Sequence, residues 1–384
     1  MKRIFFLFLL SAIGLSCYAK TQISLLTAGP TDEYVFLLYG HTALRVRTET
    51  QDLVYNYGYF SMQQDNFFLN FMLGKPMYSL GVTSFEDFLL EYVLQGRSVT
   101  EQVLNFSEEE CAKLENKLKK NALPENRDYI YNFYFDNCAT RPRDLIEQTA
   151  NGLVYNIDSG KIPTFREAIR NQSRPAQWYT VGTDLCLGWK SDQRMTIKDA
   201  AFLPNLLLQE LDHAYRKDNG EAIILAKIEH APQTRDINRD ISPIAWPMLT
   251  FMLLALGYAF LFFFGDKHKV GLTTLRSLIY FVLGTGGVII WFLSLVSAHP
   301  HTYPNANMLL LHPMWYVLSA SVWCKTQKYV HMNYWLYLIN FVAIVIYLML
   351  GYKQVLPQGV PILALLVGVD LLLQILAERK RTNI

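Results

Sequence analysis

After residue 246 the chain alternates between long apolar stretches and short polar segments. Five stretches contain hardly any charged residues and lie at 247–264, 277–298, 308–323, 334–351 and 359–377. Most approach the roughly 20 residues that a helix needs to cross a bilayer, and the third is marginal. The pattern predicts an all-α membrane domain of about five transmembrane helices at 247–377, with a cytoplasmic tail at 378–384.

The polar segments between these stretches differ in charge. Eight of the nine basic residues beyond residue 240 lie in the segments 266–276, 324–333 and 378–384. Because basic loops stay in the cytoplasm, the alternate loops and everything before the first stretch are predicted to lie outside a bacterial inner membrane. The protein is thus expected to be a multi-pass membrane protein with its N-terminal domain in the periplasm.

The N-terminus agrees with this orientation. Lys2 and Arg3 precede an apolar run, and small residues lead up to Ala19. This order is typical of a secretory signal peptide at 1–19. Lipoprotein processing at Cys17 and an uncleaved anchor are the alternatives.

Residues 20–225 have the pattern of a soluble α+β domain. Segments typical of strands lie at 25–27, 41–47, 53–60 and 129–135. The second and third of these predict a hairpin. Ser107 opens a predicted helix at 111–120 with capping-box spacing, and Asn137 or its neighbour caps a second helix. The polar segment 226–246 is predicted to be the linker to the membrane domain.

Composition narrows the classes of function. The chain has 35 basic and 33 acidic residues, a formal net charge of +2, and only 18% of its residues are charged. This balance is too neutral for a nucleic-acid-binding protein, and a hydrophobic share of 51% excludes a disordered one. His299 and His301 supply only two metal ligands, so neither a metal site nor a cofactor is predicted.

Two residues of the soluble domain have the chemistry of a nucleophile and its base. Cys138 lies in the first turn of the second predicted helix, where the helix dipole lowers the pKa of a thiol. His41 shares a strand face with Ala43 and is expected to face a cleft, where it can act as the base. Asn56 on the neighbouring strand is the candidate that orients the imidazole.

Structural interpretations of the same residues stay open at this point. An exported cysteine is often half of a disulfide, and the soluble domain has Cys111, Cys138 and Cys186. A Cys111–Cys186 bond leaves Cys138 free for catalysis, whereas a bond to Cys138 excludes that role. Arg141 either binds substrate or lies on the solvated face of its helix.

Four short motifs of the soluble domain occur together. They are Tyr39-Gly40-His41-Thr42-Ala43-Leu44-Arg45-Val46, Tyr55-Asn56-Tyr57-Gly58, Pro124-Glu125-Asn126-Arg127 and Asp136-Asn137-Cys138-Ala139-Thr140-Arg141. The combination resembles the Lnb family, the lipoprotein N-acyltransferases of Bacteroides, and the likeness continues into the membrane part. The resemblance implies a permuted papain-like (NlpC-type) domain with Cys138 on a helix and His41 on a sheet. It also implies a substrate-binding role for the loop with His299, His301, Asn305 and Asn307.

The resemblance further implies acyl transfer through a thioester. Cys138 would take an acyl chain from a membrane phospholipid and pass it to the α-amine of the diacylglyceryl-cysteine of a lipoprotein. The expected partners are therefore the lipid bilayer, the phospholipid donor and the diacylated lipoprotein acceptor. The alternatives are an NlpC-type cell-wall amidase, a phospholipase and a non-catalytic membrane scaffold.

Overall fold

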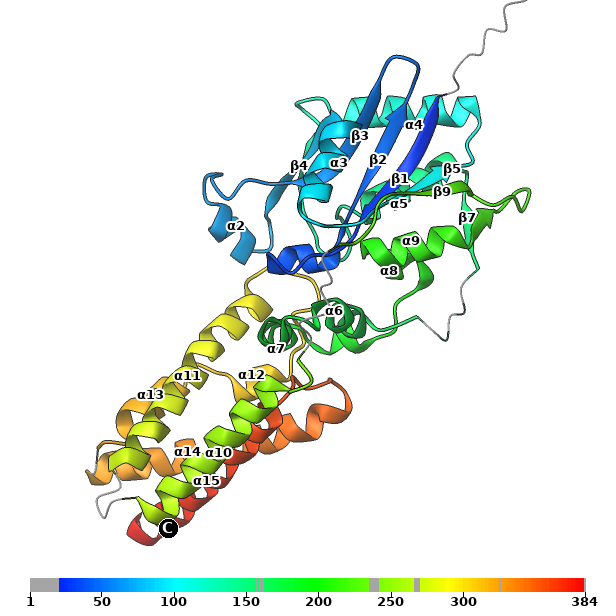
Figure 1. The fold of residues 1–384 in the computed structure, drawn as a ribbon. Coiled ribbons are helices and arrows are strands. Elements are labelled where there is room, and N and C mark those ends of the chain that lie inside the picture. Colours follow the sequence, from blue (N-terminus) through cyan, green and yellow to red (C-terminus); the bar gives the residue numbers. More distant parts are fainter. Residues whose placement is uncertain are drawn as a thin grey trace, which may run out of the picture.

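A seven-stranded antiparallel sheet forms the N-terminal part of the protein (Figure 1). The computed structural model describes residues 21–156, 158, 160, 162–234, 242–265, 270–324 and 326–382, so the signal peptide predicted at 1–19 lies outside the described residues. The strand order is β6-β4-β3-β2-β1-β5-β9. The strands are β1 (Gln22–Ala28), β2 (His41–Arg47), β3 (Asp52–Tyr59), β4 (Met77–Ser84), β5 (Val99–Leu104), β6 (Asp128–Ile130) and β9 (Ile224–Ala231).

The predicted hairpin and capping box are both present. β2 and β3 pair antiparallel, with Leu44 opposite Tyr55. Ser107 accepts a hydrogen bond from the backbone N–H of Glu110, and the Glu110 side chain accepts one from the backbone N–H of Ser107. These two bonds satisfy orphan N–H groups at the start of α4 (Glu108–Asn121) and fix where the helix begins.

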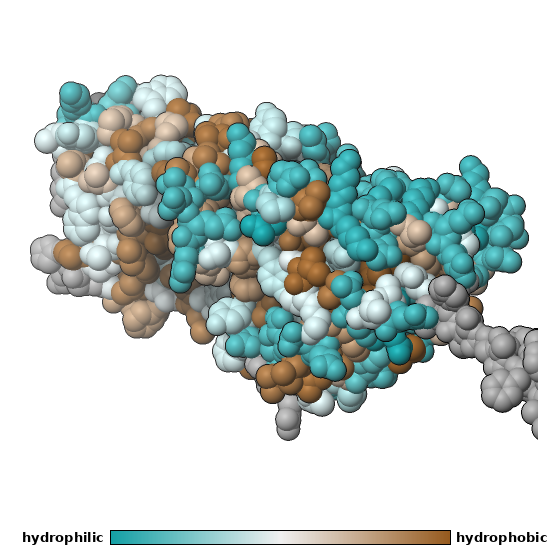
Figure 2. Space-filling view, turned by 90° about the horizontal axis from the view of Figure 1, so that it is seen from above, coloured by the Kyte–Doolittle hydropathy of each residue, from teal (hydrophilic) through white to brown (hydrophobic). Residues whose placement is uncertain are grey.

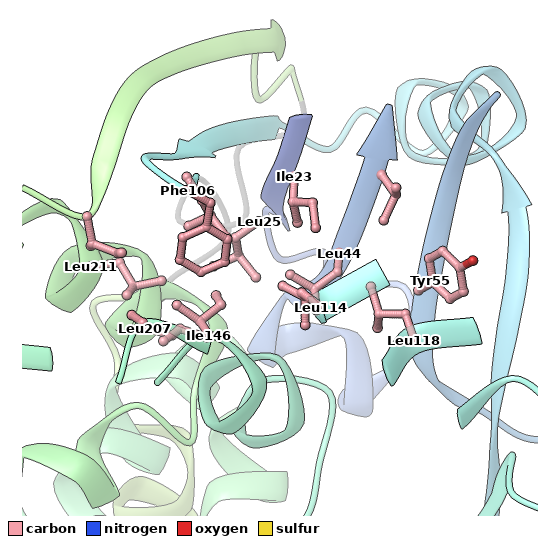
Figure 3. Close-up of a cluster of buried hydrophobic side chains, with 14 of the residues drawn as sticks. Ile23, Leu25, Leu44, Tyr55, Phe106, Leu114, Leu118, Ile146, Leu207 and Leu211 are labelled. Atoms are coloured by element: carbon pink, nitrogen blue, oxygen red, sulfur yellow. The ribbon is translucent and has the colours of Figure 1, made fainter. Parts of the chain in front are cut away.

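Helices cover both faces of the sheet. α4, α5 (Thr140–Thr149) and α9 (Pro204–Asp212) cover one face, and α3 (Phe85–Leu94) covers the other. On the first face a large apolar cluster is buried between strands and helices (Figure 3); it includes Ile23, Leu25, Leu44, Leu114, Leu118, Ile146, Leu207 and Leu211. Burying each side chain of this size contributes ~1.5–3 kcal/mol, so the cluster is a major source of stability. The predicted α+β fold is confirmed.

The strand predicted at 129–135 is wrong beyond Ile130. β6 pairs with β4 only over Asp128–Ile130. The side-chain oxygen of Asn132 then accepts hydrogen bonds from the backbone N–H groups of Tyr134 and Phe135, each at 3.1 Å. This Asx turn redirects the chain away from the sheet, and it depends on one asparagine within an aromatic pattern.

The linker predicted at 226–246 is wrong over its first residues. Ile224–Ala231 forms β9, which pairs antiparallel with β5. β9 is the edge strand of the sheet and most of its residues are exposed. Edge strands commonly carry charged residues, which protect them from pairing with other chains. The polar, charged composition of this edge strand is also typical of a linker, which is why the prediction failed here.

Shorter elements extend the sheet part toward the helical region. They are η1 (Val35–Tyr39), α2 (Phe67–Met72), β7 (Leu153–Tyr155), α6 (Phe165–Ser173), α7 (Gln177–Cys186), η3 (Trp189–Asp192), α8 (Ile197–Ala200) and β8 (Ala214–Arg216). α6 and α7 lie between the sheet and the long helices (Figure 1). The buried Arg166 of α6 pairs with Asp184 of α7 at 3.1 Å and with Asp192 at 2.7 Å, which holds this layer together.

Four helices of the described part are long and apolar enough to cross a membrane: α10 (Trp246–Phe264), α11 (Val270–Leu295), α14 (Gln327–Met349) and α15 (Val360–Thr382). α14 ends in the short helix η4 (Leu350–Tyr352). Seen from above, hydrophilic residues dominate the near face over the sheet part, and hydrophobic residues gather on the more distant helical part (Figure 2). α15 runs through most of the predicted tail at 378–384.

The marginal third stretch does not form one helix. It is broken into α12 (Asn307–Leu310) and α13 (Trp315–Ser321). Pro313 lies in the break, where a residue without a backbone N–H disrupts helical hydrogen bonding. Trp315 bridges the break by donating from its indole N–H to the carbonyl oxygen of Leu310 at 2.8 Å. The estimate of about five membrane helices therefore holds as four long helices and one broken pair.

The break packs against a glycine of α11, and this contact is testable. A Cβ at Gly287 would lie 2.5 Å from backbone atoms of His312, so Gly287→Ala is expected to destabilise the helical part by about 1–3 kcal/mol. Thermal unfolding of the detergent-solubilised protein measures the loss. Gly257→Ala on α10 is the matched control, because nothing lies within 4 Å of a Cβ there. Equal melting temperatures for the two variants would contradict this packing.

An ion pair is buried among the long helices. Arg276 of α11 donates to Asp370 of α15 at 2.8 Å, and the hydroxyl groups of Tyr258 and Tyr280 donate to the same carboxylate. Charged side chains inside a membrane domain are costly unless they are paired and hydrogen-bonded. Asp370 has both kinds of partner here, and the pair joins α10, α11 and α15.

Candidate active site

A cavity of about 750 Å³ lies where the sheet part meets the long helices. Its walls include Cys138, His41 and Asn56 from the sheet part, together with Leu293 and His299 at the end of α11 and in the loop after it. Most other residues in the wall are aromatic or aliphatic. This size and character are typical of a binding site for a largely apolar small molecule. The three residues predicted to be catalytic therefore line one cavity.

Cys138 lies in a tight turn directly before α5, two residues ahead of the first helical turn in which it was predicted, because the helix begins only at Thr140. The side-chain oxygen of Asn137 accepts hydrogen bonds from the backbone N–H groups of Ala139 at 2.8 Å and Thr140 at 2.9 Å. The amide nitrogen of the buried Asn137 donates to the carbonyl oxygen of Phe202 at 2.9 Å. The Thr42 hydroxyl donates to the carbonyl oxygen of Cys138. Asn137 and Thr42 of β2 thus fix the backbone that carries the Cys138 thiol.

His41 and Asn56 form the predicted pair on neighbouring strands. Nε2 of His41 lies 2.5 Å from Oδ1 of Asn56. An amide oxygen only accepts hydrogen bonds, so Nε2 carries the proton and Nδ1 is left with its lone pair. The imidazole also stacks on Tyr92 of α3, with ring centroids 6.4 Å apart. This tautomer makes Nδ1 the nitrogen that can accept a proton from a thiol.

Gly58 brings the thiol and the imidazole together. A Cβ at this position would lie 3.5 Å from Cε1 of His41 and 3.6 Å from Cβ of Cys138. The φ angle of Gly58 is +109°, in the region that side chains rarely adopt. The φ angle therefore favours glycine here, and Gly58 lies next to both His41 and Cys138.

The apolar cavity controls the protonation of both groups. Burial raises the pKa of the Cys138 thiol to about 11, although nearby backbone N–H groups of Thr42 and Cys138 favour the thiolate. Burial lowers the pKa of His41 to about 4. The predicted lowering of the thiol pKa by the start of α5 is wrong, because desolvation outweighs the helix dipole. At neutral pH the pair is a neutral thiol beside a neutral base.

The neutral pair predicts a broad pH profile. A reaction of the Cys138 thiol that uses His41 as its base requires unprotonated His41, whose pKa of about 4 leaves it unprotonated at all higher pH. The rate at which the thiol attacks an electrophile is therefore expected to be flat from about pH 5 to 9 and to fall only near pH 4. Rapid-quench mass spectrometry of the covalently modified protein measures this step. A loss of rate above about pH 8 would instead indicate a preformed thiolate–imidazolium pair.

Of the four loop residues predicted to bind substrate, only His299 lines the cavity. Its Nε2 donates to the carbonyl oxygen of Phe71 in α2 at 2.7 Å. His301 is packed instead against Tyr134 and Phe165, with ring centroids 4.8 Å from each. Aromatic neighbours therefore hold His301 away from the cavity.

The two asparagines of this loop fasten it to the sheet part. The Asn305 amide donates to the carbonyl oxygens of Leu185 and Cys186, and the Asn307 amide donates to those of Asp184 and Leu185. These carbonyls belong to the last turn of α7, where helical partners are missing. The structure gives Asn305 and Asn307 a capping position rather than the predicted substrate contact. It also places the loop on the side of the sheet part, in agreement with the loop charges.

Arg141 is engaged away from the cavity. Its guanidinium forms two hydrogen bonds to Asp136, at 2.5 and 2.9 Å, and lies 3.6 Å from the ring centroid of Tyr129. Arg141 is not part of the cavity wall. The arginine therefore braces the loop before Cys138, and the prediction of a substrate contact does not fit this position.

The cysteines proposed as a disulfide are far apart in the fold. Cys111 belongs to α4 and is buried in the core of the sheet part. Cys186 lies at the end of α7 and lines the cavity. Cys138 and Cys186 both carry free thiols. The alternative in which Cys138 is consumed by a disulfide is therefore wrong.

Two residues that line the cavity were not predicted from the sequence. Gly58 was part of a recognised motif, but its role depends on a backbone angle and on two distant neighbours. Arg97, which follows α3 and lines the cavity, had no signal in the sequence. A basic residue next to a glycine looks like a surface turn, and only the fold reveals its burial.

Comparison with known proteins matches two separate parts of the chain. Residues 18–171 match the family model described as the Lnb N-terminal periplasmic domain, and residues 239–382 match the Lnb transmembrane domain. The first match contains His41, Asn56 and Cys138. No curated protein and no solved structure matches the chain. The protein is thus a multi-pass membrane protein whose sheet part is periplasmic.

Proposed function

Because the chain belongs to the Lnb family, we propose that it is a lipoprotein N-acyltransferase of the bacterial inner membrane. It takes an acyl chain from a membrane phospholipid and transfers it to the α-amine of the diacylglyceryl-cysteine at the start of a lipoprotein. Cys138 is the nucleophile, His41 is the base and Asn56 orients the base.

One observation carries this proposal: Cys138, His41 and Asn56 line an apolar cavity whose wall is completed by Leu293 and His299 of the membrane domain. An enzyme that cleaves cell-wall peptides needs a polar groove for its substrate. A mostly apolar cavity at the end of a membrane helix instead suits substrates that stay in the bilayer. The shared wall also supplies proximity, since both lipid substrates diffuse in the plane that α11 crosses.

The arrangement of the pair supports the predicted permuted papain-like chemistry. In this proposal Nδ1 of His41 takes the thiol proton while the sulfur attacks an ester carbonyl of the donor lipid. The backbone N–H of Cys138, at the start of α5, stabilises the oxyanion. The C–S bond forms, the ester C–O bond breaks, and His41 returns the proton to the leaving oxygen. A lysolipid departs and the acyl chain stays on Cys138 as a thioester.

The second half of the reaction uses the same groups in reverse. The lipoprotein α-amine attacks the thioester carbonyl, so that a C–N bond forms and the C–S bond breaks. His41 takes a proton from the amine and returns it to the Cys138 sulfur. The product is an N-acylated lipoprotein and the enzyme is regenerated. No group outside the cavity is needed for either half.

The test is the mass of lipoprotein N-terminal peptides from cells with and without this protein, in a host that has no other N-acyltransferase. Triacylated N-termini are expected only when the protein is present. Diacylated N-termini in both cases, with free fatty acid released when the protein is present, would replace the proposal with a phospholipase.

A further inference from the structure

The described part of the protein buries six arginines, and one of them differs from the others. Arg45, Arg143, Arg166, Arg216 and Arg276 each form an ion pair with at least one carboxylate. Arg97 is only 2% exposed and forms no ion pair with any residue that the structure describes. A buried cation without an anion is costly, because desolvation is not offset by charge pairing.

The hydrogen-bond partners of Arg97 are neutral, and Glu91, the acidic residue of the cavity wall whose charge acts on it, forms no ion pair with it in the described structure. Nε donates to the carbonyl oxygen of Gly29 at 2.6 Å, and Nη1 donates to the side-chain oxygen of Gln95 at 3.1 Å. The guanidinium carbon lies 4.5 Å from the ring centroid of Tyr92. Nη2 has no hydrogen-bond partner among the described residues. The side chain is therefore held in place without an ion pair and with one N–H₂ group that has no hydrogen-bond partner in the described structure.

Arg97 belongs to the wall of the cavity that holds Cys138 and His41. Its ring neighbour Tyr92 also stacks on His41, so the guanidinium and the base share one aromatic neighbour. The charge of Arg97 lowers the pKa of both His41 and Cys138, which agrees with its closeness to them. An anionic group of a ligand in this cavity would meet Arg97 as its cation.

We infer that Arg97 binds the phosphate of the donor phospholipid and so positions the acyl ester at Cys138. This inference rests on the proposed function and adds the recognition of the donor to it. In a phospholipid the phosphate is a few bonds from the ester carbonyls, and the acyl chains are apolar, like most of the cavity wall. Guanidinium groups bind phosphate oxygens with charge-assisted hydrogen bonds, and in Arg97 the Nη2 group is left to donate them. The acceptor lipid carries no phosphate, so Arg97 acts on the first half of the reaction.

The experiment compares two donors with the same acyl chains, phosphatidylethanolamine and diacylglycerol, on the purified full chain in detergent. The readout is the rate of thioester formation on Cys138 by rapid-quench mass spectrometry. The wild type is expected to prefer the phospholipid by about 10- to 100-fold. Arg97→Met is expected to lose this preference, because only the reaction with the phospholipid slows. Arg97→Lys is expected to keep part of the preference, because lysine retains the positive charge.

The control is Arg45→Met, which removes a buried arginine that also lies over an aromatic ring but has two carboxylate partners and lies outside the cavity wall. It is expected to lower thermal stability and to leave the donor preference unchanged. Equal slowing of both donors by Arg97→Met would overturn the inference, because a role in the fold or at the oxyanion affects every ester alike. Absence of thioester from either donor in the wild type would instead overturn the proposed function.

Discussion

Replacing Cys138 by alanine is expected to abolish N-acylation while the protein stays folded in the membrane. The thioester needs the sulfur, and no other side chain at the start of α5 can replace it. Loss of one half-buried sulfur costs only on the order of 1–2 kcal/mol, and the Asn137 bonds that shape the turn do not involve it. Intact-mass analysis of lipoprotein N-terminal peptides should show diacylated forms in place of triacylated ones.

The controls are the two other thiols of the periplasmic domain. Cys186 is the sharper one, because it lines the same cavity, is free and has a pKa raised to about 11 by burial, as Cys138 has. It lacks an imidazole partner in the described structure, so Cys186→Ser should keep activity. Cys111→Ser tests the core thiol. Normal triacylation in cells that rely on a well-expressed Cys138→Ala variant would refute the thioester.

Features with a local cause were predictable from the sequence. Apolar length marks α10, α11, α14 and α15, and residues three apart define the capping box at Ser107. Chemistry and the family resemblance predicted that Cys138 and His41 lie near each other, since a thiol nucleophile needs a base beside it. Both residues line the same cavity. The pairing of His41 with Asn56 followed from their places on adjacent strands.

Features that depend on burial were not predictable in the same way. The loop asparagines looked like ligand-binding groups because their partners, the last carbonyls of α7, come from a segment more than a hundred residues away in sequence. The pKa of Cys138 was expected to fall because the helix start is visible in the sequence, whereas the apolar wall that raises it is assembled from many segments. The sequence therefore located the residues that line the cavity together better than it described their environment.

That environment sets the size of the second large effect, the loss expected when His41 is replaced by alanine. With a thiol pKa of about 11, only about one Cys138 in ten thousand is a thiolate at pH 7. Without the base, attack depends on this fraction, so thioester formation at pH 7 is expected to fall by about 10³- to 10⁴-fold. The Cys138→Ala/His41→Ala double variant should be no worse than Cys138→Ala alone, because the two groups act as one unit.

The pH profile separates a base from a merely structural histidine. In His41→Ala the rate is expected to rise about tenfold per pH unit between pH 7 and 10, as hydroxide takes over the deprotonation, whereas the wild-type rate stays flat. Asn56→Ala is the control. This variant keeps the imidazole base but no longer holds its orientation, so it should lower the rate less than His41→Ala does. Its rate should depend on pH as the wild-type rate does. A His41→Ala variant that is slow at every pH, with no rise toward pH 10, would mean that the imidazole shapes the cavity and that another group removes the thiol proton.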